Sequence, residues 1–81
     1  MNQARLLERI TINPGVLVGK PTIRGLRITV EQILKALAGG VTVQDLLADY
    51  PELEPQDIQA VLLYAAELVS EEQVFEVGID T

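Results

Sequence analysis

Between positions 30 and 69 the apolar residues recur with the spacing of helical faces, and they predict three helices. The first begins after Thr29, which forms a capping box with Gln32, and it ends at a Gly-Gly pair. The second is capped by Thr42 and stopped by Pro51. Each boundary therefore has a local chemical cause.

The third helix opens at Pro55, the residue type favoured at a first helical position. On a helical wheel its predicted core stripe holds Ile58, Val61, Leu62, Ala65, Leu68 and Val69. Leu63 falls on the opposite, polar face, within an apolar or aromatic run from residue 60 to 66. A helix that is apolar nearly all round is covered on more than one side, so we expect a homodimer with Ala60, Leu63 and Tyr64 in the contact.

Before the helices, short β-rich runs predict strands rather than helices. Ile10–Ile12 reads as a brief strand, and residues 22–24 and 27–29 read as two strands around a two-residue Gly-Leu loop. Gly at the first loop position predicts a type II′ turn. In this β-hairpin Ile23 and Ile28 share one face. The fold class expected is mainly α, a three-helix bundle preceded by a β-hairpin.

In that hairpin Arg24 and Arg27 lie opposite each other on the second face. Two like charges in such a pair repel, so an anion must compensate them. Two explanations stay open: Glu31 or Glu8 of the same chain, or a phosphate or carboxylate on a partner, which arginine binds well.

The 81 residues are enough for one domain, and the 48% apolar and 22% charged fractions are typical of a folded one. So small a domain leaves apolar surface in need of a partner. We divide it into an N-terminal arm, a β-hairpin region, a three-helix bundle and an acidic tail, at residues 1–9, 10–29, 30–69 and 70–81.

The chain has no cysteine and no histidine, which removes the thiol nucleophile, the cysteine zinc site and the usual general base. No apolar stretch reaches the length of a membrane span. We expect a cytoplasmic, non-enzymatic protein without a metal or cofactor.

Two motifs that could suggest chemistry are set aside. A phosphate-binding loop over residues 15–22 would need Gly in place of Pro14 and Ser or Thr in place of Pro21. Five carboxylates near helix ends are expected to form a solvated face, namely Asp45, Asp49, Glu52, Glu54 and Asp57.

The net charge of -6 is divided unevenly along the chain. Residues 1–35 carry all six basic groups and a charge of +4, whereas residues 36–81 carry -10 and no basic group. Such asymmetry indicates contact with nucleic acid at the basic end or with a protein at the acidic end, with internal neutralisation as the alternative.

Helices two and three suggest a helix-turn-helix, in which the second helix normally enters the major groove. That helix starts Glu-Pro-Gln-Asp and carries no Lys or Arg, so it would repel phosphates. If DNA is bound, we expect the contact to be made by Arg24 and Arg27, with Lys20 and Arg9 assisting.

The acidic tail also carries apolar side chains. Phe75, Val77 and Ile79 are expected to anchor it on a partner protein, with the charge speeding encounter with a basic surface. The alternative is that Phe75 packs on the domain's own core.

Several runs closely resemble the bacterial and archaeal domain-of-unknown-function family 433, over about residues 8 to 69. The most specific stretch is Gly19-Lys20-Pro21, Ile23-Arg24-Gly25 and Arg27-Ile28, supported by Ile10 to Gly15, Tyr50-Pro51, Asp57-Ile58 and Tyr64-Ala65-Ala66. The resemblance implies a homeodomain-like helix-turn-helix fold and a role as the antitoxin partner of a PIN-like nuclease toxin in type II pairs.

Two positions depart from the family pattern. Leu26 stands where the family usually has Thr, and Val18 stands where it often has Gly. Leu26 puts an apolar side chain on the hairpin tip and favours a protein contact there.

The residues predict a protein that binds a partner protein and DNA, and the resemblance implies that it is an antitoxin-like regulator whose partner is a nuclease toxin and whose DNA is an operator. A stand-alone DNA-binding transcriptional regulator is the alternative. A carboxylate metal-dependent hydrolase has no second motif to support it.

Overall fold

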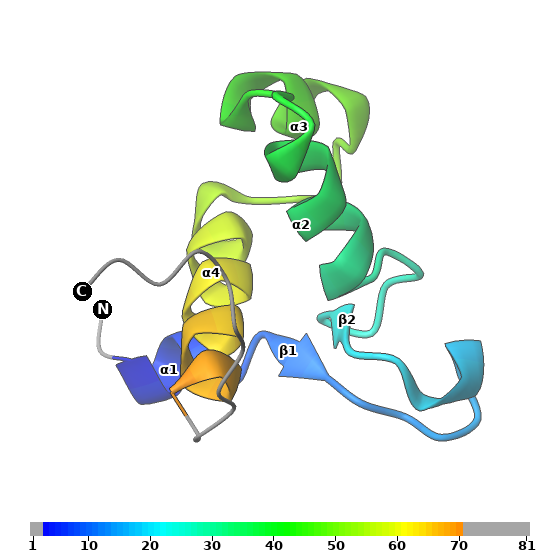
Figure 1. Cartoon of the computed structure of the whole chain (residues 1–81). Coiled ribbons are helices and arrows are strands. Elements are labelled where there is room, and N and C mark those ends of the chain that lie inside the picture. Colours follow the sequence, from blue (N-terminus) through cyan, green and yellow to red (C-terminus); the bar gives the residue numbers. More distant parts are fainter. Residues whose placement is uncertain (1–2, 71–81) are drawn as a thin grey trace.

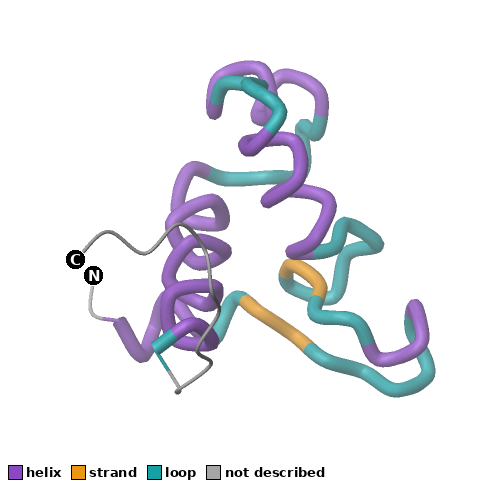
Figure 2. The backbone as a smooth tube through the Cα atoms, in the orientation of Figure 1, coloured by secondary structure: helices purple, strands orange, loops and turns teal. Residues whose placement is uncertain are grey.

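The structure is a computed structural model and describes residues 3–70. It is mainly helical, with one small antiparallel sheet (Figures 1 and 2). Along the chain the elements are α1 (Gln3–Leu7), β1 (Ile10–Thr11), the 3-10 turn η1 (Leu17–Gly19), β2 (Thr22–Ile23), α2 (Val30–Ala38), α3 (Val43–Asp49) and α4 (Pro55–Val69). Within this part of the chain no helix is long and apolar enough to cross a membrane.

The three predicted helices begin where the caps place them. The Thr29 hydroxyl accepts from the Gln32 backbone N–H at 3.0 Å, and the Gln32 side chain accepts from the Thr29 N–H at 2.8 Å. The Thr42 hydroxyl accepts from the Asp45 N–H at 3.1 Å. Pro55 is the first residue of α4. The capping predictions are therefore confirmed.

The predicted hairpin has the right register and the wrong turn. Thr22 forms an antiparallel bridge with Thr29, and the Ile23 N–H donates to the Ile28 C=O at 3.0 Å, as predicted. The second predicted strand makes no more than this bridge, and β2 pairs instead with β1. The turn places Arg24 and Gly25 at its centre, with φ of 44° and 74°, and Leu26 N–H donates to Ile23 C=O at 2.7 Å. Positive φ at both central residues is the I′ pattern, not the expected II′. Arg24 consequently sits in the turn and does not face Arg27.

The core lies where α2, α3 and α4 meet the sheet. Its buried members are Ile23, Ile28, Val30, Ile33, Leu46, Leu53, Ile58 and Val61. α1 lies beside the opposite side of α4 (Figure 1), so the N-terminal arm is in part a helix packed on the bundle.

α4 departs from its predicted wheel in its second half. Leu62, Leu68 and Val69 were expected in the core, yet they are 49%, 52% and 69% exposed. Leu68 and Val69 border an open groove beside α2 and do not pack directly against a neighbouring element. Ala60, expected in a dimer contact, is fully buried within the single chain and cannot touch a second copy.

Candidate functional site

A buried charge cluster joins the turn after β2 to the first turn of α4. The Asp57 side chain has no exposed area. Arg24 approaches it with two nitrogens, Nε at 3.0 Å from Oδ1 and Nη2 at 2.9 Å from Oδ2. The same Nη2 donates to the Glu52 carbonyl at 2.7 Å. This two-point geometry makes the ion pair strong and directional.

Arg9, just before β1, completes the cluster. Its Nη1 lies 3.0 Å from Asp57 Oδ1 and 2.8 Å from Glu54 Oε1. Asp57 Oδ2 also accepts from the Glu54 backbone N–H at 2.8 Å, which caps α4. One carboxylate therefore binds two guanidinium groups and a helix N-terminus.

Burial and hydrogen bonding have opposite effects on the pKa of Asp57. Burial alone would raise the pKa, because a charged carboxylate loses its water. Hydrogen bonds from Arg24, the Glu54 N–H and Arg9 outweigh burial, and the pKa of Asp57 is lowered. The carboxylate is thus ionised at neutral pH.

The expectation that Asp57 belongs to a solvated face is wrong, whereas Asp45, Asp49, Glu52 and Glu54 are exposed as expected. A signal in the sequence could have indicated its burial. Asp57 precedes the buried Val61 by four residues, so both lie on the same face of α4.

The four predicted DNA-contacting residues are separated by the fold. Arg9 and Arg24 converge on Asp57, and the Lys20 ammonium lies 3.0 Å from Glu31. Arg27 is exposed, and within residues 3–70 it has no hydrogen-bond or ion-pair partner. It is accordingly the member of the set whose charge is most available to a ligand.

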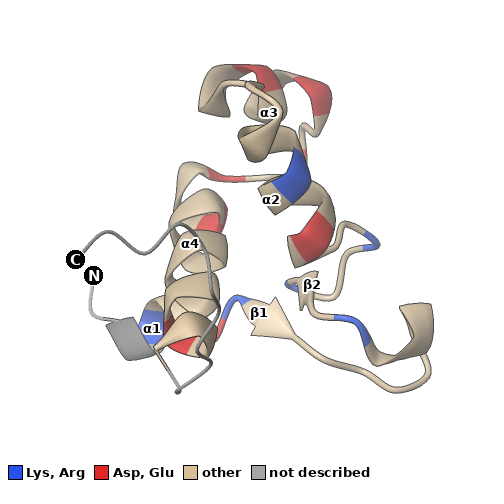
Figure 3. Cartoon of the chain, viewed as in Figure 1, with Lys and Arg blue, Asp and Glu red and all other residues tan. Residues whose placement is uncertain are grey.

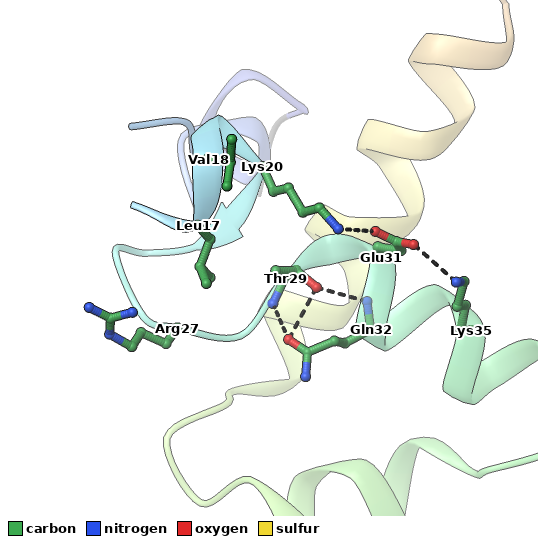
Figure 4. Close-up of a pocket in the computed structure, with 8 residues that line it drawn as sticks. All are labelled: Leu17, Val18, Lys20, Arg27, Thr29, Glu31, Gln32 and Lys35. Atoms are coloured by element: carbon green, nitrogen blue, oxygen red, sulfur yellow. Dashed lines mark hydrogen bonds and ion pairs between the residues drawn. The ribbon is translucent and has the colours of Figure 1, made fainter. Parts of the chain in front are cut away.

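Arg27 lines an open cleft of about 590 Å³ at the start of α2 (Figure 4). Lys20 and Lys35 line it too, and Glu31 lies between them at 3.0 Å from each ammonium. Hydrogen bonds from Lys35 and Lys20 lower the pKa of Glu31. Three cations against one anion leave the cleft with a net positive charge.

The far wall of this cleft is a strained apolar tip. Leu17 and Val18 both have left-handed backbones, with φ of 51° and 57°, and Val18 is 94% exposed. A β-branched residue in this region is a clear outlier. The sequence hinted at it, because Val18 stands where the resembled family often has Gly.

On the other side of α2 lies an apolar groove of about 350 Å³ between α2 and the second half of α4. Its floor and walls include Val30 and Leu34 from α2 and Tyr64, Ala65, Leu68 and Val69 from α4. Glu31 and Lys35 line both this groove and the basic cleft. The two surfaces therefore adjoin along one edge of α2.

The remaining predicted contact residues fall in different places. Leu26 is half-buried and packs against the core, and Leu63 is also half-buried. Tyr64, expected in a dimer contact, lines the groove. Phe75, Val77 and Ile79 lie outside the described residues. Over residues 3–70 there is no cluster of three or more acidic side chains suited to a metal.

Charge is distributed as the sequence indicates. In Figure 3, α3 and α4 carry acidic residues and no basic ones. The helix that a helix-turn-helix would place in the major groove therefore presents no cation to phosphates.

Comparison with known proteins identifies the family. The model of a protein family described as "Protein of unknown function (DUF433)" matches residues 10–65. The uncharacterized protein y4eO of Sinorhizobium fredii (strain NBRC 101917 / NGR234) is 33% identical over 58 residues, covering 72% of this chain and 26% of that protein. This chain thus spans about a quarter of the length of that curated relative.

A solved structure extends the likeness to three dimensions. The crystal structure of a DUF433 member from Anabaena variabilis ATCC 29413 superimposes with a TM-score of 0.74 at 32% identity, over 84% of this chain and 67% of the other. Family model, sequence relative and fold agree, and the chain belongs to the DUF433 family.

Proposed function

We propose that this protein is a non-enzymatic, antitoxin-like regulator that binds a PIN-like nuclease toxin. The observation that carries the proposal is the bare apolar surface on the second half of α4, where Leu68 and Val69 are more than half exposed beside the apolar groove. Contiguous exposed apolar surface marks a protein contact. The family resemblance supplies the class of partner.

We also propose a homeodomain-like arrangement in which α3 and α4 form the helix-turn-helix. Its second helix, α4, has apolar and acidic side chains and no Lys or Arg. This chemistry favours a protein partner over a phosphate backbone at that helix. The tail residues Phe75, Val77 and Ile79 belong to the same proposed partner contact, whereas Leu26 is half-buried against the core and has little surface to offer it.

Operator DNA is a second proposed ligand, supported by the basic cleft. Arg27 has an uncommitted guanidinium there, with Lys20 and Lys35 nearby. Arg9 and Arg24 would have to leave a buried carboxylate to reach phosphates, so their share in DNA binding is smaller than the sequence suggested. A stand-alone DNA-binding regulator is the alternative function.

A homodimer is part of the proposal as well. Since Ala60 is buried, the contact would centre on the half-buried Leu63. A dimer would present two copies of Arg27 to a symmetric operator.

The decisive experiment purifies the tagged chain from its native host and tests the co-purified protein for RNA cleavage. We expect a stoichiometric nuclease that the added chain inhibits. Val69→Glu should weaken inhibition by about tenfold or more, because a buried apolar contact is lost. Val43→Glu, at an exposed apolar position on α3, is the matched control and should not weaken inhibition.

Two results would contradict the proposal. One is a co-purified protein without nuclease activity, or one that the chain does not inhibit. The other is tight, sequence-specific duplex binding by the chain alone with no second protein, which would favour the stand-alone regulator.

A further inference from the structure

The apolar groove between α2 and α4 ends where the described chain ends. Leu68 and Val69 line the groove, and α4 terminates at Val69 with Ser70 as its C-cap. Eleven more residues, 71–81, follow directly. The segment therefore starts at the mouth of the groove and needs no linker to reach it.

Its length suits the groove. Eleven residues span up to about 36 Å when extended, whereas the nine residues of α2 form a helix about 14 Å long. The first few residues of the segment can reverse the direction of the chain, and Val74 to Ile79 can still extend along the side of α2. The segment is therefore long enough to dock in the groove of its own chain.

The chemistry of the segment matches what the groove offers. Val74, Phe75, Val77 and Ile79 are apolar, and a segment of this length cannot build a core of its own. The groove presents the ring of Tyr64 and the side chains of Leu34 and Leu68. Phe75 is the single phenylalanine of the chain and its largest apolar side chain outside the described residues.

Charge also favours this occupant. Lys35, on the groove rim, shares the Glu31 carboxylate with Lys20, so the three groups together carry a positive charge. The segment carries Glu71, Glu72, Glu76 and Asp80 and no basic residue. An acidic, apolar segment thus suits an apolar groove that has, along one edge, a Lys20–Glu31–Lys35 cluster with a net charge of one.

We propose that residues 71–81 dock in the groove between α2 and α4 of their own chain, with Phe75 as the anchor and Glu76 facing Lys35. The tail then covers this surface whenever no partner does. The docking itself does not depend on the proposed function. One consequence of the docking does depend on the proposed function. A toxin that binds the groove must displace the tail, and the displaced Phe75, Val77 and Ile79 can then bind the toxin as well.

Because the chain has one phenylalanine, the test can follow a single ring. The full-length protein is labelled only at Phe and at Leu and Val methyl groups, and NOEs from the Phe75 ring are recorded in the absence of any partner. We expect NOEs to methyl groups of Leu34, Leu68 and Val69. A mixture of Phe-labelled and methyl-labelled chains then shows whether the contacts arise within one molecule.

Two leucines of α4 provide matched variants. Leu62 and Leu68 are exposed to nearly the same extent, and of the two only Leu68 lines the groove. Leu68→Glu should remove the NOEs and return the Phe75 ring shifts to those of an unfolded chain, whereas Leu62→Glu should leave both unchanged.

Each other result overturns the proposal. NOEs seen only between molecules would assign the groove to the tail of a second copy. Absence of NOEs to the groove in the parent protein, or their survival in Leu68→Glu, would show that the tail lies elsewhere. None of these results depends on whether a nuclease partner exists.

Discussion

Arg24 and Asp57 make a two-point ion pair between positions 33 residues apart, with nitrogen to oxygen distances of 3.0 and 2.9 Å. Arg24 holds this position from a left-handed turn, with φ of 44°. The strain is compensated by contacts to a buried carboxylate and to the Glu52 carbonyl. The pair fastens the N-terminal β element to α4.

Removing the Arg24 guanidinium should therefore destabilise the fold. For Arg24→Ala we expect a loss of about 3 kcal/mol in the free energy of unfolding, since a buried charge loses a partner. Arg24→Lys should recover only part of it, because one ammonium cannot reproduce the two-point contact. Urea unfolding measures both. Arg27→Ala, at an exposed arginine, is the control and should change stability by less than about 0.5 kcal/mol.

Acid should remove the contribution of Asp57. Its pKa is lower in the folded chain than in the unfolded one, so its stabilising effect is complete above the unfolded pKa and is lost as the pH falls through the folded pKa. The stability difference between the parent and Asp57→Asn should thus be largest near neutrality and shrink below about pH 4. Unfolding curves across that range test it. A difference that stays constant with pH would contradict the assignment.

The tip of η1 should tolerate glycine better than valine. Val18 has φ of 57° and is 94% exposed, so Val18→Gly relieves left-handed strain of about 1 to 2 kcal/mol and loses no buried surface. The added freedom of glycine in the unfolded chain offsets about half of this gain. We expect a net gain of about 0.5 to 1 kcal/mol, seen as a higher Tm. Val16→Gly, at an extended residue with φ of -124°, should lower Tm instead.

Any DNA affinity should depend on Arg27 more than on α4. Arg27→Glu should weaken binding and reduce the slope of log K against log salt by about 1 for each copy bound, because one phosphate contact is lost. Gln56→Ala and Gln59→Ala should have little effect. Fluorescence anisotropy of a labelled operator duplex at several salt concentrations measures this. Loss of binding in the glutamine variants, with the Arg27 variant unaffected, would show that α4 reads the groove.

Local chemistry made much of the fold predictable. The Thr29 and Gln32 capping box, the Thr42 cap and Pro55 each act within one helical turn, so the sequence alone locates the starts of α2, α3 and α4. The pairing of β2 with β1 was not predictable in this way. It depends on residues 13 positions apart, Ile10 and Ile23, and on a turn that places an arginine at positive φ.

The charge cluster was missed for a related reason. The local sequence at a helix start does not distinguish an aspartate that faces water from one that pairs with an arginine distant in the chain. What buries Asp57 is the arrival of Arg9 and Arg24, 48 and 33 residues away. The exposure of Leu68 and Val69 was missed because a helical wheel identifies an apolar face but not the length over which neighbours cover it.

The Asp57 cluster also sets an order for folding during synthesis. The ribosome releases Arg9 and Arg24 before the carboxylate that compensates them, so the growing chain has two cations and no buried anion between them. The β1–β2 pairing has two residue pairs and gains its charged fastening only when the first turn of α4 has emerged. The N-terminal half consequently lacks both this charged fastening and two core residues, Ile58 and Val61, until α4 has been made.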